Sequence, residues 1–301
     1  MKVLRDAKKN KAAICSSIKK FGFSAEHNYQ HYICKQAPSR KCVFFDFGQK
    51  KGIMALFNGH SKTWHVLADI LAPQEEQLAI FMKFLDYALT KKKSKKITAE
   101  FSEGFKQQVF SRLRNSKYRA AVNYELYWPV YDLQSWDDKL GGKQWKKLRN
   151  INNRFMNHSK VRIQNPRKIS KNALRSILLQ WLRKRSSTDR VDLAYYLNII
   201  DNNFRGFDMA KVISIDGEPC AVSAGWKIPN TDCFYCAIGL SNYSRKDLWD
   251  FANLNDLTYL KKAGYRHVDL GGSDRALLSA KSKFRPAKVY KTCIFSVAKK
   301  V

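Results

Sequence analysis

A pair of glycines followed by a row of cations stands near the end of the 301-residue sequence. Gly271 and Gly272 come directly after a predicted strand, where the missing side chains let the backbone approach a ligand closely. Ser273 or Asp274 can supply the N-cap of the helix that follows. The cations at and beyond this helix are Lys281, Lys283, Arg285, Lys288 and Lys291. A tight turn needs glycine for steric reasons alone, but glycines together with these cations predict a site for an anionic ligand.

Other polar groups in the same segment extend this candidate site. Asp269 lies in the strand that leads to the glycine pair, and Tyr290 lies beyond the helix. Both are candidates for the site, although turn, cap and sheet roles are commoner for such residues. His267, at the start of the strand, has the chemistry of a base, but a structural or exposed histidine is the commoner case.

The second chemically distinctive segment is a predicted helix over residues 143–157. Its apolar residues recur every three or four positions and form one stripe, made of Trp145, Leu148, Ile151 and Phe155. The cations on its other faces include Lys146, Lys147, Arg149 and Arg154. A docked helix with a solvated charged face is the alternative explanation. Every charged residue between Asp138 and Asp189 is basic, however, so the acid-free segment 139–188 predicts a surface for a polyanion.

The whole chain shares this bias, with 56 Lys and Arg against 25 Asp and Glu and a formal charge of +31. This excess indicates nucleic acid or an anionic membrane surface as partner, with general surface solubility as the alternative. No run approaches the roughly 20 apolar residues that cross a bilayer, and the N-terminus lacks an apolar signal segment. The seven cysteines are odd in number and scattered. We therefore expect a cytoplasmic protein with reduced thiols, whose membrane contact, if any, is peripheral at the inner face.

The order of elements predicts two similar halves, 1–133 and 134–301. In the first half, short aromatic and β-branched segments predict a strand meander, followed by helix, strand, helix and strand. The predicted meander strands are 32–35, 41–48, 52–59 and 62–71, and the helix that follows covers 75–92. The second half begins with helices, continues through a hairpin turn at Asp216 and Gly217, and ends in a strand at 289–297. This order predicts an α/β (α+β) fold with mainly antiparallel mixed sheets.

Two further patterns favour structural roles over chemistry. Cys233 and Cys236 have C-x-x-C spacing, but they lie in an apolar strand and no second pair follows, so core packing is favoured over zinc or redox chemistry. The six histidines show no spacing typical of metal ligands. We therefore expect no metal centre.

Three segments together resemble a known family: KQWKKLRNINNRF, GEPCAVSAGW and YRHVDLGGSDRALLSAKSKF. They are similar to the catalytic C-terminal domain of phosphatidylglycerol lysyltransferases and to the related Fem-type peptidyltransferases. The resemblance covers mainly residues 139–298, and the N-terminal half fits by element order. It implies two tandem GNAT-like acyltransferase domains, with the basic helix and the active site in the second.

The resemblance also implies an activity, the transfer of an amino acid from aminoacyl-tRNA. The catalytic residues are then Lys281, Lys283 and Asp269, and the tRNA and substrate contacts are Lys146, Lys147, Arg149, Arg154, Gly271, Gly272, Ser273, Arg285 and Tyr290. An aminoacyl ester is already activated, so orientation and stabilisation of the carbonyl oxygen suffice, and no cofactor is required. Such lysyltransferases commonly carry a membrane-embedded domain that this sequence lacks, which leaves a lipid, peptide or small-molecule acceptor open. The transferred amino acid, the general base and the oligomeric state also remain open.

Two other functions compete with this one. An acyl-CoA acetyltransferase shares the fold, but the segment IGLSNYSRKDLWDF has no glycine after Gly239 where the cofactor's pyrophosphate loop would lie, so acyl-CoA ranks second as donor. A noncatalytic nucleic-acid-binding protein would use the same basic surface and leave the aminoacyl ester intact.

Overall fold

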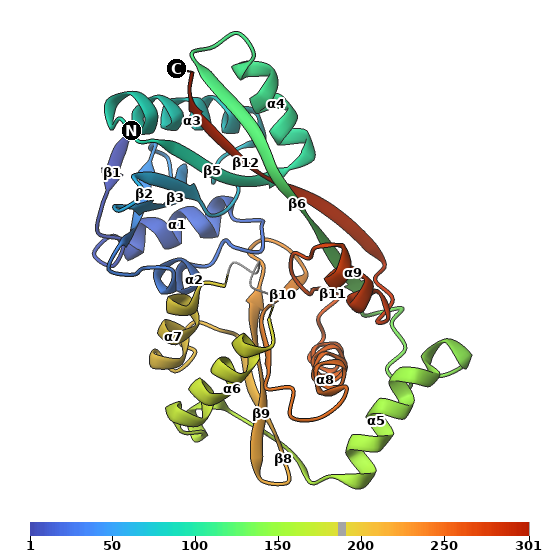
Figure 1. Cartoon of the computed structure of the whole chain (residues 1–301). Coiled ribbons are helices and arrows are strands. Elements are labelled where there is room, and N and C mark those ends of the chain that lie inside the picture. The colour runs from blue at the N-terminus through green and yellow to red at the C-terminus, as the bar shows by residue number, and fades with distance from the viewer. Residues whose placement is uncertain (186–190, 301) are drawn as a thin grey trace.

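A single mixed sheet runs through the whole molecule (Figure 1). The computed structural model describes residues 1–185 and 191–300, so residues 186–188 of the acid-free segment lie outside the described part. The sheet has 12 strands in the order β1-β2-β3-β4-β5-β12-β6-β11-β10-β9-β8-β7. The two predicted halves therefore share one continuous sheet, with helices on both of its faces.

The first half contains five helical segments among its strands. Its elements are β1 (Lys2–Leu4), α1 (Lys11–Phe21), α2 (Tyr29–Cys34), β2 (Arg40–Asp46), β3 (Gly52–Asn58), β4 (Thr63–Val66), α3 (Gln74–Asp86), the π-helical η1 (Tyr87–Lys91), β5 (Lys96–Ser102), α4 (Glu103–Leu113) and β6 (Tyr118–Asp132). Alternate residues of β2 point to opposite faces, so Phe44 packs with α1 and α2 whereas Phe45 packs with α3. Each face of this part of the sheet thus has its own apolar core.

The second half repeats this two-sided arrangement. Its elements are η2 (Lys143–Trp145), α5 (Lys146–His158), β7 (Val161–Gln164), η3 (Pro166–Lys168), α6 (Lys171–Arg183), α7 (Leu193–Asp201), β8 (Met209–Ile215), β9 (Glu218–Lys227), β10 (Cys233–Ser241), α8 (Leu248–Lys262), β11 (His267–Asp269), α9 (Arg275–Ser282) and β12 (Lys288–Lys299). Val212 of β8 packs with α6 and α7, and its neighbour Ile213 packs with α5 and α8. As predicted, Leu148, Ile151 and Phe155 bury the apolar stripe of α5.

The long strands β6 and β12 join the two halves. The closing strand β12 returns to the first half, where Cys293 pairs with Phe101 of β5. On its other side β12 pairs antiparallel with β6 over almost its full length. The domain boundary at residue 133 stays a prediction. The closing strand β12 belongs to the second half of the sequence but pairs with β5 and β6 of the first half.

At two places in the otherwise antiparallel sheet, neighbouring strands are parallel. β4 pairs with β5 only as far as Val66 and Ala99, and β10 pairs with β11 only as far as Tyr235 and Asp269. Beyond these residues each pair separates, which leaves room for side chains between strands. Glu100 and Gly271 therefore lie at or just past points where the sheet opens.

One predicted element is wrong and one turn is confirmed. Residues 32–35 were expected as a strand, but residues 32–34 belong to the helix α2 and Lys35 is its C-cap. The Asn28 side chain caps this helix by accepting the His31 N–H, and Tyr32 is buried within it, so capping and burial outweigh the β propensity of its aromatic residues. The hairpin turn at Asp216 and Gly217 joins β8 to β9, and both residues have the positive φ of such turns. No described helix is long and apolar enough to cross a membrane.

Candidate functional site

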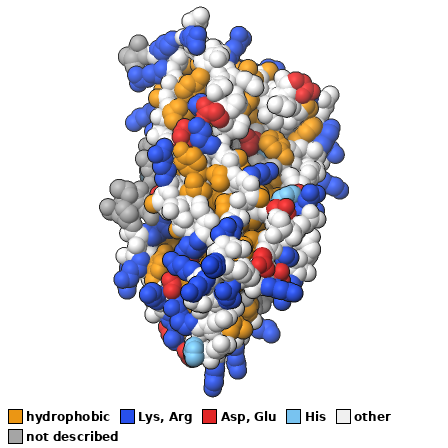
Figure 2. Space-filling view, turned by 90° about the vertical axis from the view of Figure 1, so that its right-hand side faces the viewer, with side chains coloured by type: hydrophobic (Ala, Val, Ile, Leu, Met, Phe, Trp, Pro, Cys, Tyr) orange, Lys and Arg blue, Asp and Glu red, His pale blue; other side chains and the backbone are white. Residues whose placement is uncertain are grey.

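A cavity of about 1010 Å³ lies where the two halves meet. Its walls come from the end of α1 and the loop after it, the loop between β4 and α3, the ends of β5 and β11, and the cavity-facing residues of β6 and β12. We call it the central cavity. Figure 2 looks onto the right-hand side of Figure 1 and shows an acidic side chain set back in a hollow of this face.

Five carboxylates line the central cavity. Asp232 is exposed and lies 3.0 Å from His267 Nδ1, and the other four are Glu26, Asp69, Glu100 and Asp269. Burial raises the pKa of Asp69 and of Asp269 to about 6. Burial, reinforced by the charge of Glu26, raises the pKa of Glu100 to about 7. In a chain with net charge +31, this cavity is therefore lined by a group of acids, with Lys20 and Lys288 as the lysines of its lining.

Asp269 has both carboxylate oxygens occupied by hydrogen bonds. Oδ1 accepts the backbone N–H of Gly271 at 2.7 Å, and Oδ2 accepts the Tyr290 hydroxyl at 2.7 Å. The Tyr290 ring stacks on Trp128 at 5.7 Å between centroids. The structure thus brings together the predicted residues Asp269, Gly271 and Tyr290, and it gives Asp269 a role in holding the turn.

Lys281 lies behind that turn and does not line the central cavity. It is buried, and its ammonium group donates to the carbonyl oxygens of Leu270 at 2.6 Å and Gly271 at 3.0 Å. Burial lowers the pKa of Lys281 to about 8. Gly271 has φ +84°, which favours glycine, and a Cβ at Gly272 would lie in tight contact with Trp128, at 3.0 Å. Asp274 caps α9, and the Ser273 hydroxyl donates to the Gly271 carbonyl oxygen.

Glu100 is held by a directed chain of hydrogen bonds. The Trp128 indole N–H donates to Thr292 Oγ1 at 2.8 Å, and Thr292 Oγ1 donates to Glu100 Oε1 at 2.5 Å. Because an indole can only donate, the Thr292 proton must point to the carboxylate. Glu100 Oε2 has no hydrogen-bond partner among residues 1–185 and 191–300.

Glu26 is the cavity carboxylate with a buried histidine beside it. His31 Nε2 lies 3.5 Å from Glu26 Oε1, and the Tyr195 hydroxyl lies 2.8 Å from His31 Nδ1. Burial opposes the charge of Glu26, but His31 and the Lys35 cation hold the pKa of Glu26 below its ordinary value. Burial lowers the pKa of His31, so the ring is neutral at pH 7 and Glu26 keeps a negative charge.

Lys283 is directed away from the central cavity. Its ammonium group binds both oxygens of the buried Asp250, at 2.7 and 2.8 Å, and lies over the Trp249 ring. Both partners belong to the first turn of α8. Of the three residues predicted as catalytic, only Asp269 lines the central cavity.

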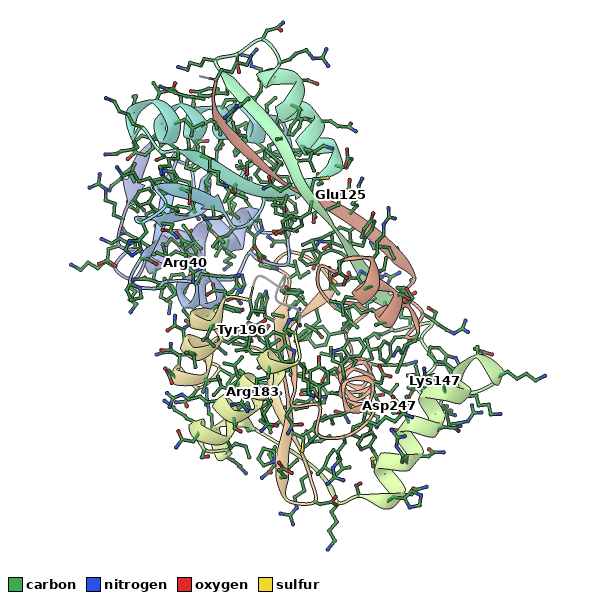
Figure 3. All side chains as sticks on the ribbon, in the orientation of Figure 1. Arg40, Glu125, Lys147, Arg183, Tyr196 and Asp247 are labelled. Atoms are coloured by element: carbon green, nitrogen blue, oxygen red, sulfur yellow. The ribbon has the colours of Figure 1, made fainter. Side chains whose placement is uncertain are left out.

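The predicted tRNA contacts gather on and beside α5, apart from the turn residues. Lys146 and Lys147 are exposed and have no acidic partner in the described part of the chain. Arg149 instead donates to the carbonyl oxygens of Leu140 and Gly142, and Arg154 forms an ion pair with Asp247 at 2.9 Å. Arg285 lies over the Trp145 ring and so adjoins the start of α5. We use the name α5 surface for the five cations Lys146, Lys147, Arg149, Arg154 and Arg285. Figure 3 labels Lys147 on α5 and Asp247 near α8, and Figure 2 shows Lys and Arg side chains gathered over the lower part of its face.

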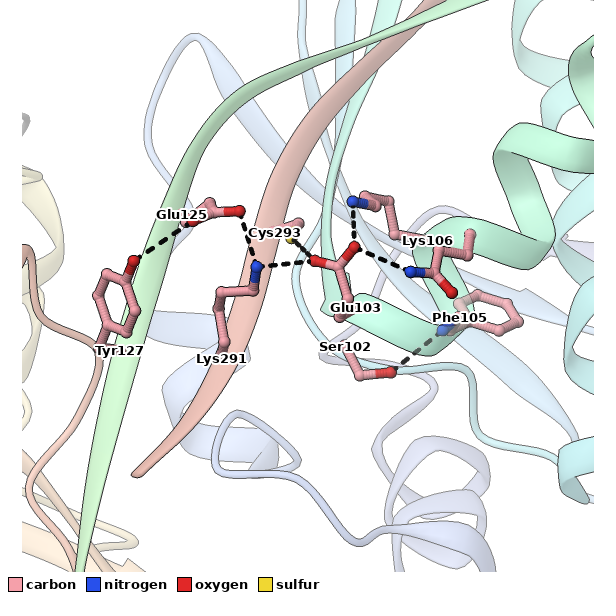
Figure 4. A network of polar contacts seen from close by, with 9 residues as sticks. Ser102, Glu103, Phe105, Lys106, Glu125, Tyr127, Lys291 and Cys293 are labelled. Carbon is pink, nitrogen blue, oxygen red and sulfur yellow. Dashed lines mark hydrogen bonds and ion pairs between the residues drawn. The ribbon is translucent and has the colours of Figure 1, made fainter. Parts of the chain in front are cut away.

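A separate polar network lies at the joint of α4, β6 and β12 (Figure 4). Metal-ligating atoms of Glu103, Glu125 and Cys293 lie within 4.8 Å of one another. The Lys291 ammonium group stands between the carboxylates, 3.1 Å from Glu103 and 2.9 Å from Glu125. Hydrogen bonds from Cys293, Lys106 and Lys291 lower the pKa of Glu103 to about 2. The lysine supplies the positive charge that a cation would bring, so this network is an ion-pair joint between strands.

Sequence reasoning missed Glu26, Asp69 and Glu100. They lie in three separate segments and share no motif, so spacing offered no signal. Each is an isolated acid in a basic chain, and the fold alone brings them to one cavity. His27 was also not singled out: its Nδ1 accepts two backbone N–H groups and its Nε2 lies 2.9 Å from the Asp69 carbonyl oxygen, which fixes the cavity wall.

Residues 44–295 match the family described as phosphatidylglycerol lysyltransferase, C-terminal. The chain belongs to this family. Its members are transferases, and the predicted family and the tandem GNAT-like fold are confirmed. This supports an acyltransferase-type enzyme.

Solved structures share the fold at low sequence identity. The C-terminal domain of a protein assigned as a lysylphosphatidylglycerol synthetase from Agrobacterium fabrum is 17% identical, with a TM-score of 0.64 over 97% of this chain and 92% of that chain. L-PGS from Bacillus licheniformis is 16% identical, with a TM-score of 0.66 over 96% and 91%. FemX is 10% identical, with a TM-score of 0.62 over 97% of each chain. A search among curated proteins gave no match.

Proposed function

We propose that the chain transfers a cationic aminoacyl group from aminoacyl-tRNA to a lipid hydroxyl, with phosphatidylglycerol as the first acceptor to test. The observation that carries this proposal is the central cavity, whose carboxylates Glu26, Asp69 and Glu100 lie inside a strongly basic chain. Every aminoacyl ester bears an α-ammonium group, and a basic side chain adds a second cation. Partly buried carboxylates attract such groups more strongly than exposed ones because less water screens them.

The α5 surface supports RNA as the donor's carrier. Lys146 and Lys147 are exposed and without acidic partners among the described residues, so they are available to phosphates. An RNA that carries a basic aminoacyl ester at its end would match both sites, because its phosphates suit the α5 surface and its cationic aminoacyl group suits the central cavity. An acidic peptide or a free anion would match the surface but not the cavity.

The start of α8 favours tRNA over acyl-CoA as donor. In the related acetyltransferases a pyrophosphate would lie at this helix N-terminus, but here Asp247 and Asp250 occupy it, and Asp250 is already held by Lys283. A pyrophosphate would meet two carboxylates there. Acyl-CoA therefore remains the second candidate.

Two observations support a lipid acceptor. The family carries phosphatidylglycerol in its description. In addition, Val122, Tyr124, Val289 and Tyr290 are large exposed hydrophobic residues on β6 and β12, and Tyr290 also lines the central cavity. Exposed apolar side chains on these strands, with Tyr290 at the cavity, and the basic α5 surface suit contact with an anionic bilayer.

The test is to incubate the protein with a pool of tRNAs charged with labelled amino acids and with vesicles that contain phosphatidylglycerol. Vesicles of phosphatidylcholine alone are the control. We expect label from lysyl- or arginyl-tRNA in the lipid fraction of the phosphatidylglycerol vesicles. Intact esters for every tRNA, with tRNA still bound, would instead identify a noncatalytic RNA-binding protein.

A further inference from the structure

Apart from the exposed Asp232, the four carboxylates of the central cavity differ in how many of their oxygens accept hydrogen bonds from the protein. Asp269 has a hydrogen bond to each oxygen. Glu26 Oε1 lies 3.5 Å from His31 Nε2, and hydrogen bonding with its own backbone N–H and with Ser24 opposes the rise that burial causes in the pKa of Asp69. Glu100 alone combines a fixed oxygen, Oε1, with a second oxygen that has no partner in the described part of the chain. It is thus the cavity carboxylate that is held in place and still able to take a proton.

Glu100 lies at the point where β4 and β5 stop pairing. The parallel pairing of β4 with β5 ends at Ala99, and Glu100 is the next residue. On the other side β5 stays paired with β12, so the backbone of Glu100 is fixed opposite Ile294. A fixed backbone and a directed hydrogen bond leave the side chain little freedom, which suits proton transfer.

We infer that Glu100 is the general base of the transfer, and that Trp128 and Thr292 position it. This inference rests on the proposed function. The acceptor oxygen attacks the ester carbonyl carbon while its proton passes to Glu100 Oε2. The bond from that carbon to the tRNA 3′ oxygen then breaks, and the proton moves from Glu100 to the departing oxygen. Atoms and charge balance without any further reactant.

The charges around Glu100 agree with this role. Glu26 and Asp69 repel its negative form, Lys35 and the Thr292 hydroxyl stabilise it, and burial is the largest influence. Together they place the pKa of Glu100 at about 7, close to neutral pH, where a base is half deprotonated. Loss of the Thr292 hydroxyl removes a donor to the charged form and must raise this pKa.

The experiment measures single-turnover transfer from charged tRNA to phosphatidylglycerol vesicles between pH 5.5 and 8. In the wild type we expect the rate to rise with pH and to reach half its maximum near pH 7. Glu100→Gln should lower the rate at pH 7.5 about 100-fold, and Thr292→Val should move the midpoint up by about one pH unit. Both variants should bind tRNA as the wild type does.

The matched control is Glu125→Gln, the same chemical change on the same strand ribbon. Glu125 pairs with Cys293 of β12, so it points to the face opposite Thr292 and belongs to the ion-pair network of Figure 4. Its rate and midpoint should match the wild type. If the wild type transfers label and Glu100→Gln keeps its rate and pH profile, this inference is wrong. If the wild type transfers nothing from any charged tRNA, the proposed function fails and this inference fails with it.

Discussion

The central cavity and the α5 surface carry opposite charge and are built differently. The cavity collects carboxylates from segments that lie far apart in the sequence, and hydrogen bonds fix Asp269 and Glu100 among them. The α5 surface takes most of its cations from one helix, and Lys146 and Lys147 reach solvent without an acidic partner among the described residues. Net charge therefore describes the exterior of this protein, whereas the proposed chemistry lies beside a group of acids.

The largest expected effect comes from neutralising the cavity. Glu26→Gln combined with Asp69→Asn removes two partly buried charges that would face a cationic aminoacyl group. Transfer of a lysyl group should fall by about 100- to 1,000-fold, because each such pair is worth about 2 kcal/mol or more. Parallel assays with tRNA charged with an uncharged amino acid measure the selectivity. An equal loss for both aminoacyl groups would mean that the cavity does not recognise the side-chain cation.

The next effect concerns the wall of the cavity. Lys281→Met should lower the free energy of unfolding by about 3 kcal/mol, because the carbonyl oxygens of Leu270 and Gly271 lose their buried donor. Urea unfolding measures it, and Lys299→Met, at the exposed end of β12, is the matched control. Unchanged stability would show that the turn holds without the ammonium group.

Reversing charge on the α5 surface should act on binding. Lys146→Glu with Lys147→Glu should weaken tRNA binding about 10- to 30-fold at moderate salt and lower the salt dependence by roughly two phosphate contacts. Lys91→Glu with Lys95→Glu makes the same change at exposed sites beyond α3 and should have little effect. Equal weakening by the two pairs would mean that only total charge matters.

The smallest effect is on stability as a function of pH. The pKa of Glu100 is raised in the folded state, so the folded protein holds this proton more firmly than the unfolded chain does. Its contribution is therefore lost as the pH rises from about 4.5 to about 7. Glu100→Gln should become more stable relative to the wild type by about 1 to 2 kcal/mol between pH 5 and pH 8, measured by urea unfolding. A constant difference across this range would show that the pKa of Glu100 is ordinary.

The sequence predicted what local pattern controls. The apolar stripe of α5, the hairpin at Asp216 and the glycine turn at Gly271 all follow from spacing and backbone geometry. The exception, α2, depends on one capping side chain and on burial of Tyr32. The insertion of β12 between β5 and β6 could not be predicted, because strand neighbours far apart in the chain leave no local pattern.

The candidate site divides in the same way. Asp269 was predicted from the strand that leads to the glycine turn and Tyr290 from its place after the final helix, and both line the central cavity. Lys281 and Lys283 have partners that only tertiary structure supplies, namely two carbonyl oxygens and Asp250. A count of cations near a turn cannot tell a cation that holds the fold from one that meets a ligand.

The division of roles between the central cavity and the α5 surface is tested most directly by measuring, for the same variants, the tRNA affinity and the single-turnover transfer rate at saturating enzyme. Glu26→Gln should lower the rate and leave the affinity unchanged, whereas Lys146→Glu with Lys147→Glu should lower the affinity and leave the saturated rate unchanged. This result would assign chemistry to the central cavity and RNA binding to the α5 surface. If both variants lost affinity and saturated rate together, this division of roles would be wrong. It would also be wrong if only the α5 variant lowered the saturated rate.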